Sequence, residues 1–578
     1  MIHFCKQDFS DSKVKIRRII SNDAEPPEKY KSVCFVPKER NGAYNMADAE
    51  KILIKRAKFP EEVGVSSHAV ANFIADLNKN KIEAHSLMIL RHGKVAFECW
   101  REPYGPEFPH IMFSVSKSVT SVAVGFAIEE GLLTLETRVI DFFPEYVPAV
   151  PDKNLEKLNI YHLLTMTAGK DVPTLSDKSK DQWIKDFFDA KWAFAPGEFW
   201  RYISENTFIL CVILTKVTGM PVTDYLMPRL FEPLGFGRRP FWEKDGNGIE
   251  AGGWGLYLTT EELAKFTLCC SQGGKFNGKQ VIPEKWVKEA TKKQVENLQY
   301  TELASTSGYG YGFWRNPVPD SYRSDGLFSQ FGMVFEKYDA CFIMTASEIF
   351  EEKARDCIWR HFPGIFCGEI KEPPADAVPK EKLELAAIAD LPANPHSRLE
   401  KTIEGKILKI KKNLFLEKIK MPVGMLPSPV LQMNIEKLGN IKEVRFLFRE
   451  NECEMTWREG LYKNTILCGM DGKPRRSRIK MSQFSFTASS SAAWENENSL
   501  CVWMRPLEAV GQRQMKFVFS GGKVSIYPSS QPDAKSEMEY IAGFVDFFVK
   551  PEPVVKAAKI ILSKADKVIE PRHTGKIK

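Results

Sequence analysis

A stretch rich in proline, alanine and charged residues divides this sequence into two parts with different hydrophobic patterns. It covers residues 368–399, and such a composition is typical of a linker. Before it, short apolar runs of strand length mix with longer helical segments, which favours an α+β or three-layer arrangement. After it, apolar and polar residues alternate, as they do in half-buried strands. The linker therefore predicts two domains of different architecture.

The first domain is expected to cover residues 62–367 and to hold an antiparallel sheet flanked by helices. Gly131 is expected to end one helix, and Thr259 or Thr260 to cap the start of another with an acidic first turn. The predicted elements are a β-hairpin over residues 86–100, helices over 118–133, 206–219 and 259–274, and strands over 321–329 and 341–347.

The second domain is expected over residues 400–550 as a small antiparallel sheet or barrel, with Gly521-Gly522 at one hairpin turn. Residues 1–61 form a charged, weakly patterned N-terminal extension, which we expect to be partly helical over residues 46–59. Residues 551–578 form a basic tail, which we expect to fray.

The net charge and the cysteine pattern exclude few classes of function, but they favour some partners and compartments over others. A net charge of +7 over 578 residues is a mild bias, so it is weak support for a nucleic-acid partner. The basic stretches at residues 406–413 and 472–480 lie in the β-rich part, where charge runs are usually solvated faces. The start of the chain shows no secretory signal, and no apolar run reaches the length of a membrane span. The twelve scattered cysteines contain no CxxC pair, so we expect reduced thiols in the cytoplasm and no metal site.

The stretch FSVSKSVTS, residues 113–121, is the first to offer chemistry. Ser114 and Lys117 are three residues apart, so at a helix start both side chains lie on one face. The residues that follow are small and apolar, which predicts a buried helix. Burial lowers the pKa of a lysine, and a neutral amine can take a proton from the serine hydroxyl. On its own an SxxK motif is weak, because Ser114 can be a simple N-cap and Lys117 a surface lysine.

Several stretches in order resemble one family. They include residues 85–100, the SxxK helix within 110–146, HLLTMTAGK at 162–170, the RYISENTF segment starting at Arg201, and GGWGLYLTTEELAKF at 252–266. Together they are similar to the serine hydrolases of the class C β-lactamase and penicillin-binding-protein-like superfamily, including its esterase and 6-aminohexanoate-dimer-hydrolase-type branch. The resemblance covers about residues 62–350. It implies a β-lactamase-like fold, an antiparallel sheet flanked by helices with a helical subdomain.

The resemblance also implies roles for single residues. Ser114 would be the nucleophile that forms an acyl-enzyme, and Lys117 its proton partner. Tyr202, in the family's Y-x-N or Y-x-S position, would be the second acid or base; without the resemblance it reads as a core tyrosine.

Further residues would form the substrate-binding site. Ser204 matches the last position of the tyrosine motif. Ser324, Asp325 and Gly326 would stand for the family's third motif on an edge strand. The amides of Ser114 and Leu327 would form the oxyanion hole.

This sequence departs from the family at the third motif. A lysine that binds substrate carboxylates in true β-lactamases is missing there, and Ser329 precedes Gln330 where many relatives have glycine. The reading is therefore a serine hydrolase that acts on a small-molecule ester, amide or peptide, as a carboxylesterase or as a D-peptidase or amidase, without metal or cofactor.

Three alternatives stay open. They are a weak β-lactamase, a catalytically silent scaffold that binds a peptide or acyl ligand, and nucleic-acid binding by the basic β domain. We expect no nucleic-acid or membrane partner, and the sequence does not indicate an oligomeric state.

Overall fold

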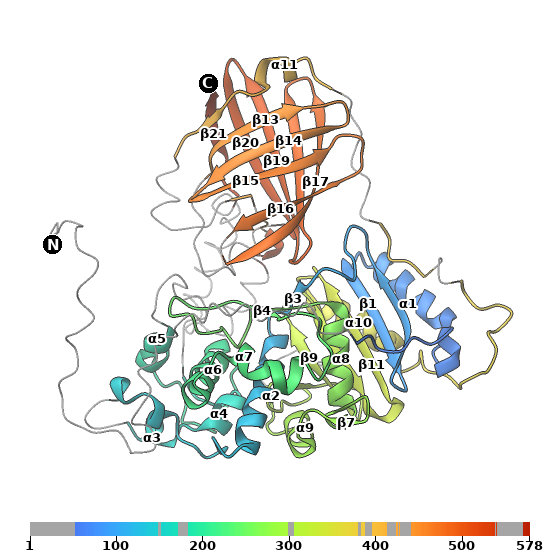
Figure 1. Cartoon of the computed structure of the whole chain (residues 1–578), viewed down its shortest axis with the longest axis vertical. Helices are drawn as coiled ribbons and strands as arrows, with labels where there is room; N and C mark the ends of the chain where they lie inside the picture. Colours follow the sequence, from blue (N-terminus) through green and yellow to red (C-terminus); the bar gives the residue numbers. More distant parts are fainter. Residues whose placement is uncertain are drawn as a thin grey trace.

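The structure is a computed structural model in which two domains follow one another along the chain (Figure 1). A mixed α+β domain precedes a β-barrel, as the change of pattern at the linker predicted. The described residues are 52–147, 152–170, 183–298, 306–379, 383–387, 396–412, 424–425, 427, 441–481, 483–533, 535–537, 539 and 570–578.

A six-stranded antiparallel sheet forms the centre of the first domain, in the order β2-β1-β11-β10-β9-β8. Strands from both ends of the domain meet in its middle, since Leu87 of β1 pairs with Met344 of β11. The predicted hairpin over residues 86–100 is confirmed as β1 and β2. The strands are β1 (Ala84–Arg91), β2 (Lys94–Trp100), β8 (Trp314–Arg315), β9 (Ser321–Gly326), β10 (Gln330–Phe335) and β11 (Ala340–Ala346).

Helices cover both faces of this sheet. Side chains alternate between the two faces of each strand, so each strand contributes residues to two cores. Met88 and Leu90 of β1 enter a core with α2 (Val115–Glu129) and α8 (Thr260–Ser271). Leu87 and Ile89 enter a second core with α1 (Ser67–Lys79) and α10 (Glu351–His361). The expected α+β fold is confirmed.

The remaining elements of this domain form a helical region and small sheets beside the main sheet. In the described part of the chain, no single helix has the length and apolarity to cross a membrane, although α6 and the bent segment Val222–Phe231 meet these criteria together. The helical elements are η2 (Pro60–Val63), η3 (Val139–Phe142), η4 (Pro144–Tyr146), α3 (Lys153–Lys157), α4 (Ile160–Leu164), α5 (Trp183–Asp189), α6 (Ser204–Thr218), α7 (Val222–Leu226), η5 (Met227–Phe231), α9 (Glu284–Thr291) and η7 (Glu336–Tyr338). The short strands are β3 (His110–Ile111), β4 (Phe241–Trp242), β5 (Leu256–Leu258), β6 (Lys275–Phe276) and β7 (Lys279–Gln280).

The local signals for helix ends were informative. Thr259 caps α8, and a capping box with Glu262 satisfies the first amides of that helix. The helix expected over residues 118–133 begins earlier, at Val115, and ends at Glu129, two residues before Gly131. The prediction of helix near residues 46–59 is wrong where the structure describes this segment. Residues 52–59 contain no helix, Arg56 forms a parallel bridge to Val95, and residues 46–51 lie outside the described residues.

The second domain is a β-barrel, whose described residues form ten strands in the order β15-β14-β13-β12-β21-β20-β19-β18-β17-β16. A parallel bridge between Gly469 of β15 and Ser491 of β17 closes it. The strands are β12 (Leu408–Ile410), β13 (Ile441–Phe448), β14 (Glu452–Glu459), β15 (Tyr462–Gly469), β16 (Arg475–Met481), β17 (Phe484–Asn496), β18 (Ser499–Pro506), β19 (Gln512–Ser520), β20 (Lys523–Gln531) and β21 (His573–Ile577), and α11 (Glu400–Ile403) precedes them.

The expectation that the basic tail frays is wrong for its described residues. β21 lies between β12 and β20 and pairs with both, for example Leu408 with Ile577 and Ile526 with His573. His573 and Gly575 are buried, so alternate residues of the strand face the barrel interior. The remainder of the expected tail, residues 551–569, lies outside the described residues, as do residues 1–51 of the expected N-terminal extension.

Candidate active site

Ser114 lies at the start of α2, and the turn before it contacts β5 on one side and the end of β9 of the main sheet on the other. Ser114 is the N-cap of α2 and is half-buried, whereas the next thirteen residues of α2 are buried. The amide of Met112 donates to the carbonyl of Leu256 at 2.8 Å, and the amide of Leu256 donates to the hydroxyl of Ser116 at 3.2 Å. These bonds hold the turn before α2 in place. Phe113 has a φ of 43°, the left-handed region that a side chain rarely adopts.

Lys117 is the centre of a polar cluster inside apolar surroundings. Its side chain is buried, with 2% of its surface exposed. Its Nζ lies 2.9 Å from Ser114 Oγ, 3.0 Å from Ser204 Oγ and 2.7 Å from the carbonyl oxygen of Gly253. The structure therefore brings together Ser114, Lys117 and Ser204, three of the residues that the sequence indicated.

The burial of Lys117 has an electrostatic consequence. Desolvation disfavours the ammonium form and lowers the pKa of Lys117 from 10.5 to about 7, while the negative charges of Glu205 and Asp325 oppose this effect. An amine with a pKa near 7 can act as a base at neutral pH.

Two glycines allow the close approach at Lys117. A Cβ on Gly253 would lie 2.7 Å from the carbonyl oxygen of Ser204, and a Cβ on Gly252 would lie 2.3 Å from Cys211 Sγ. Gly252 also has a φ of 66°. The Gly-Gly pair thus brings the carbonyl of Gly253 to Lys117, which no larger residue would permit without displacement.

Tyr202 lies next to this cluster and presents its ring. Lys117 Nζ is 4.7 Å from the centroid of the Tyr202 ring, which is a cation–π distance. The ring of Tyr202 packs against Trp200, Tyr309 and Trp314, with centroid distances of 6.1, 6.2 and 5.3 Å. This aromatic group fixes the position of the ring. Tyr202 is half-buried.

The third motif lies at the end of β9. β8 pairs only with Tyr322 and Arg323, so Ser324–Gly326 have strand β10 on one side alone. A Cβ on Gly326 would lie 2.3 Å from the carbonyl oxygen of Met112, so the end of β9 touches the turn before Ser114. Asp325 pairs with Arg323 at 2.5 Å.

The structure does not bring every predicted binding residue to Lys117. Ser324 is buried and its hydroxyl donates to the carbonyl of Gly332 on β10, so the neighbouring strand satisfies it. In the part of the chain that the structure describes, the amides of Ser114 and Leu327 donate to no protein acceptor. Both amides are therefore available to an external oxygen.

Sequence reasoning missed two residues of this cluster, Gly253 and Glu205. Gly253 lies in the GGWGLYLTTEELAKF stretch, but no role follows for it there, since a backbone carbonyl carries no signal in a sequence. Glu205 immediately follows Ser204 in the tyrosine motif and is buried in the first turn of α6, with 7% of its surface exposed. A carboxylate at the start of a buried helix is the signal that could have identified it.

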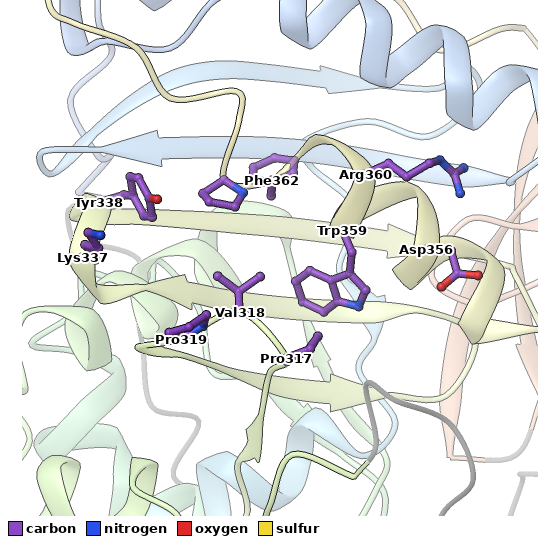
Figure 2. Close-up of a pocket in the computed structure, with 10 residues that line it drawn as sticks. Pro317, Val318, Pro319, Lys337, Tyr338, Asp356, Trp359, Arg360 and Phe362 are labelled. Carbon is purple, nitrogen blue, oxygen red and sulfur yellow. The ribbon is translucent and has the colours of Figure 1, made fainter.

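A surface pocket of about 640 Å³ lies elsewhere, between the β8–β9 loop, the β10–β11 turn and α10 (Figure 2). Trp359, Tyr338 and Pro317 line it, and none of the residues around Lys117 does. Among the described residues there is also no group of three or more histidine, cysteine or acidic side chains that could hold a metal ion.

Similarity to known proteins agrees with the fold. The sequence profile of the family described as Beta-lactamase matches residues 70–359, half of the chain. The chain therefore belongs to the beta-lactamase family, a family of hydrolases with esterase and amidase relatives. It is 27% identical over 278 residues to the 6-aminohexanoate-dimer hydrolase of Paenarthrobacter ureafaciens, covering 44% of this chain and 70% of that protein. It is 26% identical over 191 residues to esterase EstB of Burkholderia gladioli, covering 28% and 48%.

Among solved structures, a putative 6-aminohexanoate-dimer hydrolase from Bacillus anthracis aligns with a TM-score of 0.45 at 18% identity. The alignment covers 55% of this chain and 89% of that one.

Proposed function

We propose that the first domain hydrolyses a small ester or amide through an acyl-enzyme on Ser114. The observation that carries this proposal is the 2.9 Å contact between Ser114 Oγ and the Nζ of a buried lysine whose pKa is near 7. A nucleophile and a base within hydrogen-bond reach are the smallest set of groups that base-activated nucleophilic attack requires, and serine and lysine at this distance supply both.

The contacts of Lys117 support transfer of a proton from Ser114 to Lys117. The carbonyl of Gly253 can only accept, so it takes one N–H of the neutral amine. The hydroxyl of Ser204 can accept the second N–H. The lone pair of Nζ is then left for the proton of Ser114, which the amine removes as Oγ attacks the carbonyl carbon.

The reaction would proceed in two steps. Ser114 Oγ bonds to the acyl carbon, the bond to the leaving alcohol or amine breaks, and the proton held by Lys117 returns to the leaving group, with Tyr202 as the second acid. Water then attacks the acyl-enzyme and releases the acid. In both steps the amides of Ser114 and Leu327 would bind the oxyanion.

The third motif supports a substrate without a carboxylate beside the scissile bond. Ser324 stands where true β-lactamases carry the lysine that binds a substrate carboxylate, and Asp325 beside it pairs with Arg323. This favours an ester, or an amide of neutral character, over a β-lactam, and it leaves weak β-lactamase activity as the second candidate.

The test is hydrolysis of p-nitrophenyl butyrate by the wild type, by Ser114→Ala and by Ser121→Ala. Ser121 lies on the same helix and its hydroxyl has no hydrogen-bond partner, so its removal is a matched control. We expect Ser114→Ala to lose at least about 10³-fold in kcat/KM and Ser121→Ala to stay within about twofold of the wild type. Equal activity in the wild type and Ser114→Ala would show that the nucleophile is another residue. An inactive wild type in which a fluorophosphonate leaves Ser114 unlabelled would favour a binding scaffold.

A further inference from the structure

The hairpin turn between β18 and β19 of the barrel, residues 507–511, is buried against the first domain. Hairpin turns normally lie on the surface. Here Leu507, Ala509 and Val510 have no exposed surface, and Glu508 has 2%. In Figure 1 the short strands β3 and β4 of the first domain lie on the side that faces the barrel.

This turn bonds to the segment that leads into the nucleophile. The carbonyl of Glu508 accepts a hydrogen bond from the amide of Ile111 at 2.9 Å, three residues before Ser114. Ile111 is the last residue of β3, so the barrel adds a backbone bond to that strand.

One hydrophobic cluster joins the two domains around this bond. Ala509 and Val510 of the turn belong to the same buried cluster as Phe113 and Phe328 of the first domain. The rings of Phe113 and Phe328 touch, with centroids 5.3 Å apart. One buried cluster therefore contains the barrel turn, the residue before Ser114 and the residue after Leu327.

Phe113 and Phe328, the neighbours of Ser114 and Leu327, have unusual backbone conformations. Phe113 has a φ of 43°, and Phe328 and Ser329 have φ of 62° and 68°. A non-glycine residue in this region is strained and persists only where the surroundings fix it. Each strained segment carries one of the two amides that donate to no protein acceptor.

Side chains also make defined contacts across the interface between the two domains. Tyr257 of β5 stacks on Phe484 of β17 at 4.3 Å between ring centroids. Arg505 at the end of β18 pairs with Glu83 and donates to the hydroxyl of Tyr104 at 3.1 Å. These contacts join β17 and β18, the strands next to the turn, to the first domain, so the turn has support beyond its own bond to Ile111.

We propose that the β18–β19 turn of the barrel is a positioning element of the active site, which holds the amides of Ser114 and Leu327 at the spacing that an oxyanion requires. Glu508 and Val510 are its positioning residues, and neither touches the substrate. The kinetic part of this proposal rests on the proposed function, whereas the structural part does not.

The test compares Val510→Ala with Val524→Ala in the full chain. Both valines are buried in the same cluster and both changes remove the same two methyl groups. Val524 pairs with Phe519, at the end of β19 opposite the turn, so it is a matched control. Thermal unfolding sets the temperature at which both variants are folded.

Two readouts separate positioning from stability. In Val510→Ala we expect kcat for p-nitrophenyl butyrate to fall about tenfold with KM within about twofold, which is less than the 10²–10³-fold loss of a whole oxyanion donor. We expect hydrogen exchange to accelerate in peptides that cover residues 110–114 and 326–329. Val524→Ala should show neither change.

The outcomes also separate this proposal from the proposed function. Equal kcat and equal exchange in the two variants would overturn the positioning role. Faster exchange in Val510→Ala together with an inactive wild type would keep the positioning role and remove the hydrolase function. Faster exchange in an active enzyme with unchanged kcat would show that the turn holds these segments but not the oxyanion amides, which overturns the proposal.

Discussion

The pH dependence of ester hydrolysis should report the protonation of Lys117. With a pKa of about 7, about half of this amine is neutral at pH 7, against about one molecule in 3,000 for a lysine at its ordinary 10.5. The difference corresponds to a net cost of about 5 kcal/mol for the charged form, after Glu205 and Asp325 have offset part of the desolvation. We therefore expect kcat/KM to rise about tenfold per pH unit below pH 7 and to level above it.

Glu205→Gln is the perturbation that assigns this midpoint to Lys117. The charge of Glu205 raises the pKa of Lys117, so its removal lowers that pKa and moves the midpoint to lower pH. We expect a displacement of about half a unit to one unit, with an unchanged plateau. Glu289→Gln, at a carboxylate of α9 that pairs with Lys292 on the surface, is the matched control.

The assay is initial-rate hydrolysis of p-nitrophenyl butyrate between about pH 5 and pH 9 at constant ionic strength. A kcat/KM that keeps rising up to about pH 9 without levelling would refute the reasoning, because it would mean that burial does not neutralise Lys117 near pH 7. A midpoint that Glu205→Gln and Glu289→Gln leave equally unmoved would assign the titration to another group.

Three further predictions concern stability and packing. Lys117→Met should raise the free energy of unfolding most below about pH 7 and least above about pH 10. The reason is that folding lowers the pKa of Lys117, so the stability of the wild type rises with pH across that window. Urea unfolding of both proteins at several pH values measures this difference. Gly253→Ala should lower kcat/KM about 10²-fold, because its Cβ would lie 2.7 Å from the Ser204 carbonyl and displace the carbonyl that Lys117 contacts; Gly368→Ala, with nothing within 4 Å of the added Cβ, should leave kcat/KM unchanged. Removal of residues 573–578 should abolish cooperative unfolding of the barrel in a thermal melt, and a melt like that of the wild type would mean that β21 contributes little.

Much of the first domain could be predicted because its signals are local. The hairpin around Gly93 and the capping Thr259 depend on residues a few positions apart, and Ser114 and Lys117 share one helical turn. The bond from Lys117 to Gly253 could not be predicted, because it joins residues 136 positions apart through a backbone carbonyl.

The prediction for the end of the chain failed for a related reason. The segment that forms β21 is short and basic, which is typical of a frayed tail, and only its partners β12 and β20 make it a strand. The role of the barrel was equally hidden, since the burial of the turn at Glu508 depends on a surface that belongs to the other domain.

The place of β21 in the barrel has a consequence for how the chain folds. Leu408 pairs with Ile577, so closing the barrel joins residues almost 170 positions apart in sequence, which is a costly loop closure. Contacts of such long range form slowly. The first domain also depends on long-range pairing, because Leu87 of β1 pairs with Met344 of β11, 257 positions away. On refolding, the central sheet of the first domain and the barrel should therefore both form slowly, and buried tryptophans of each, such as Trp242 and Trp457, should recover their native fluorescence in a slow phase.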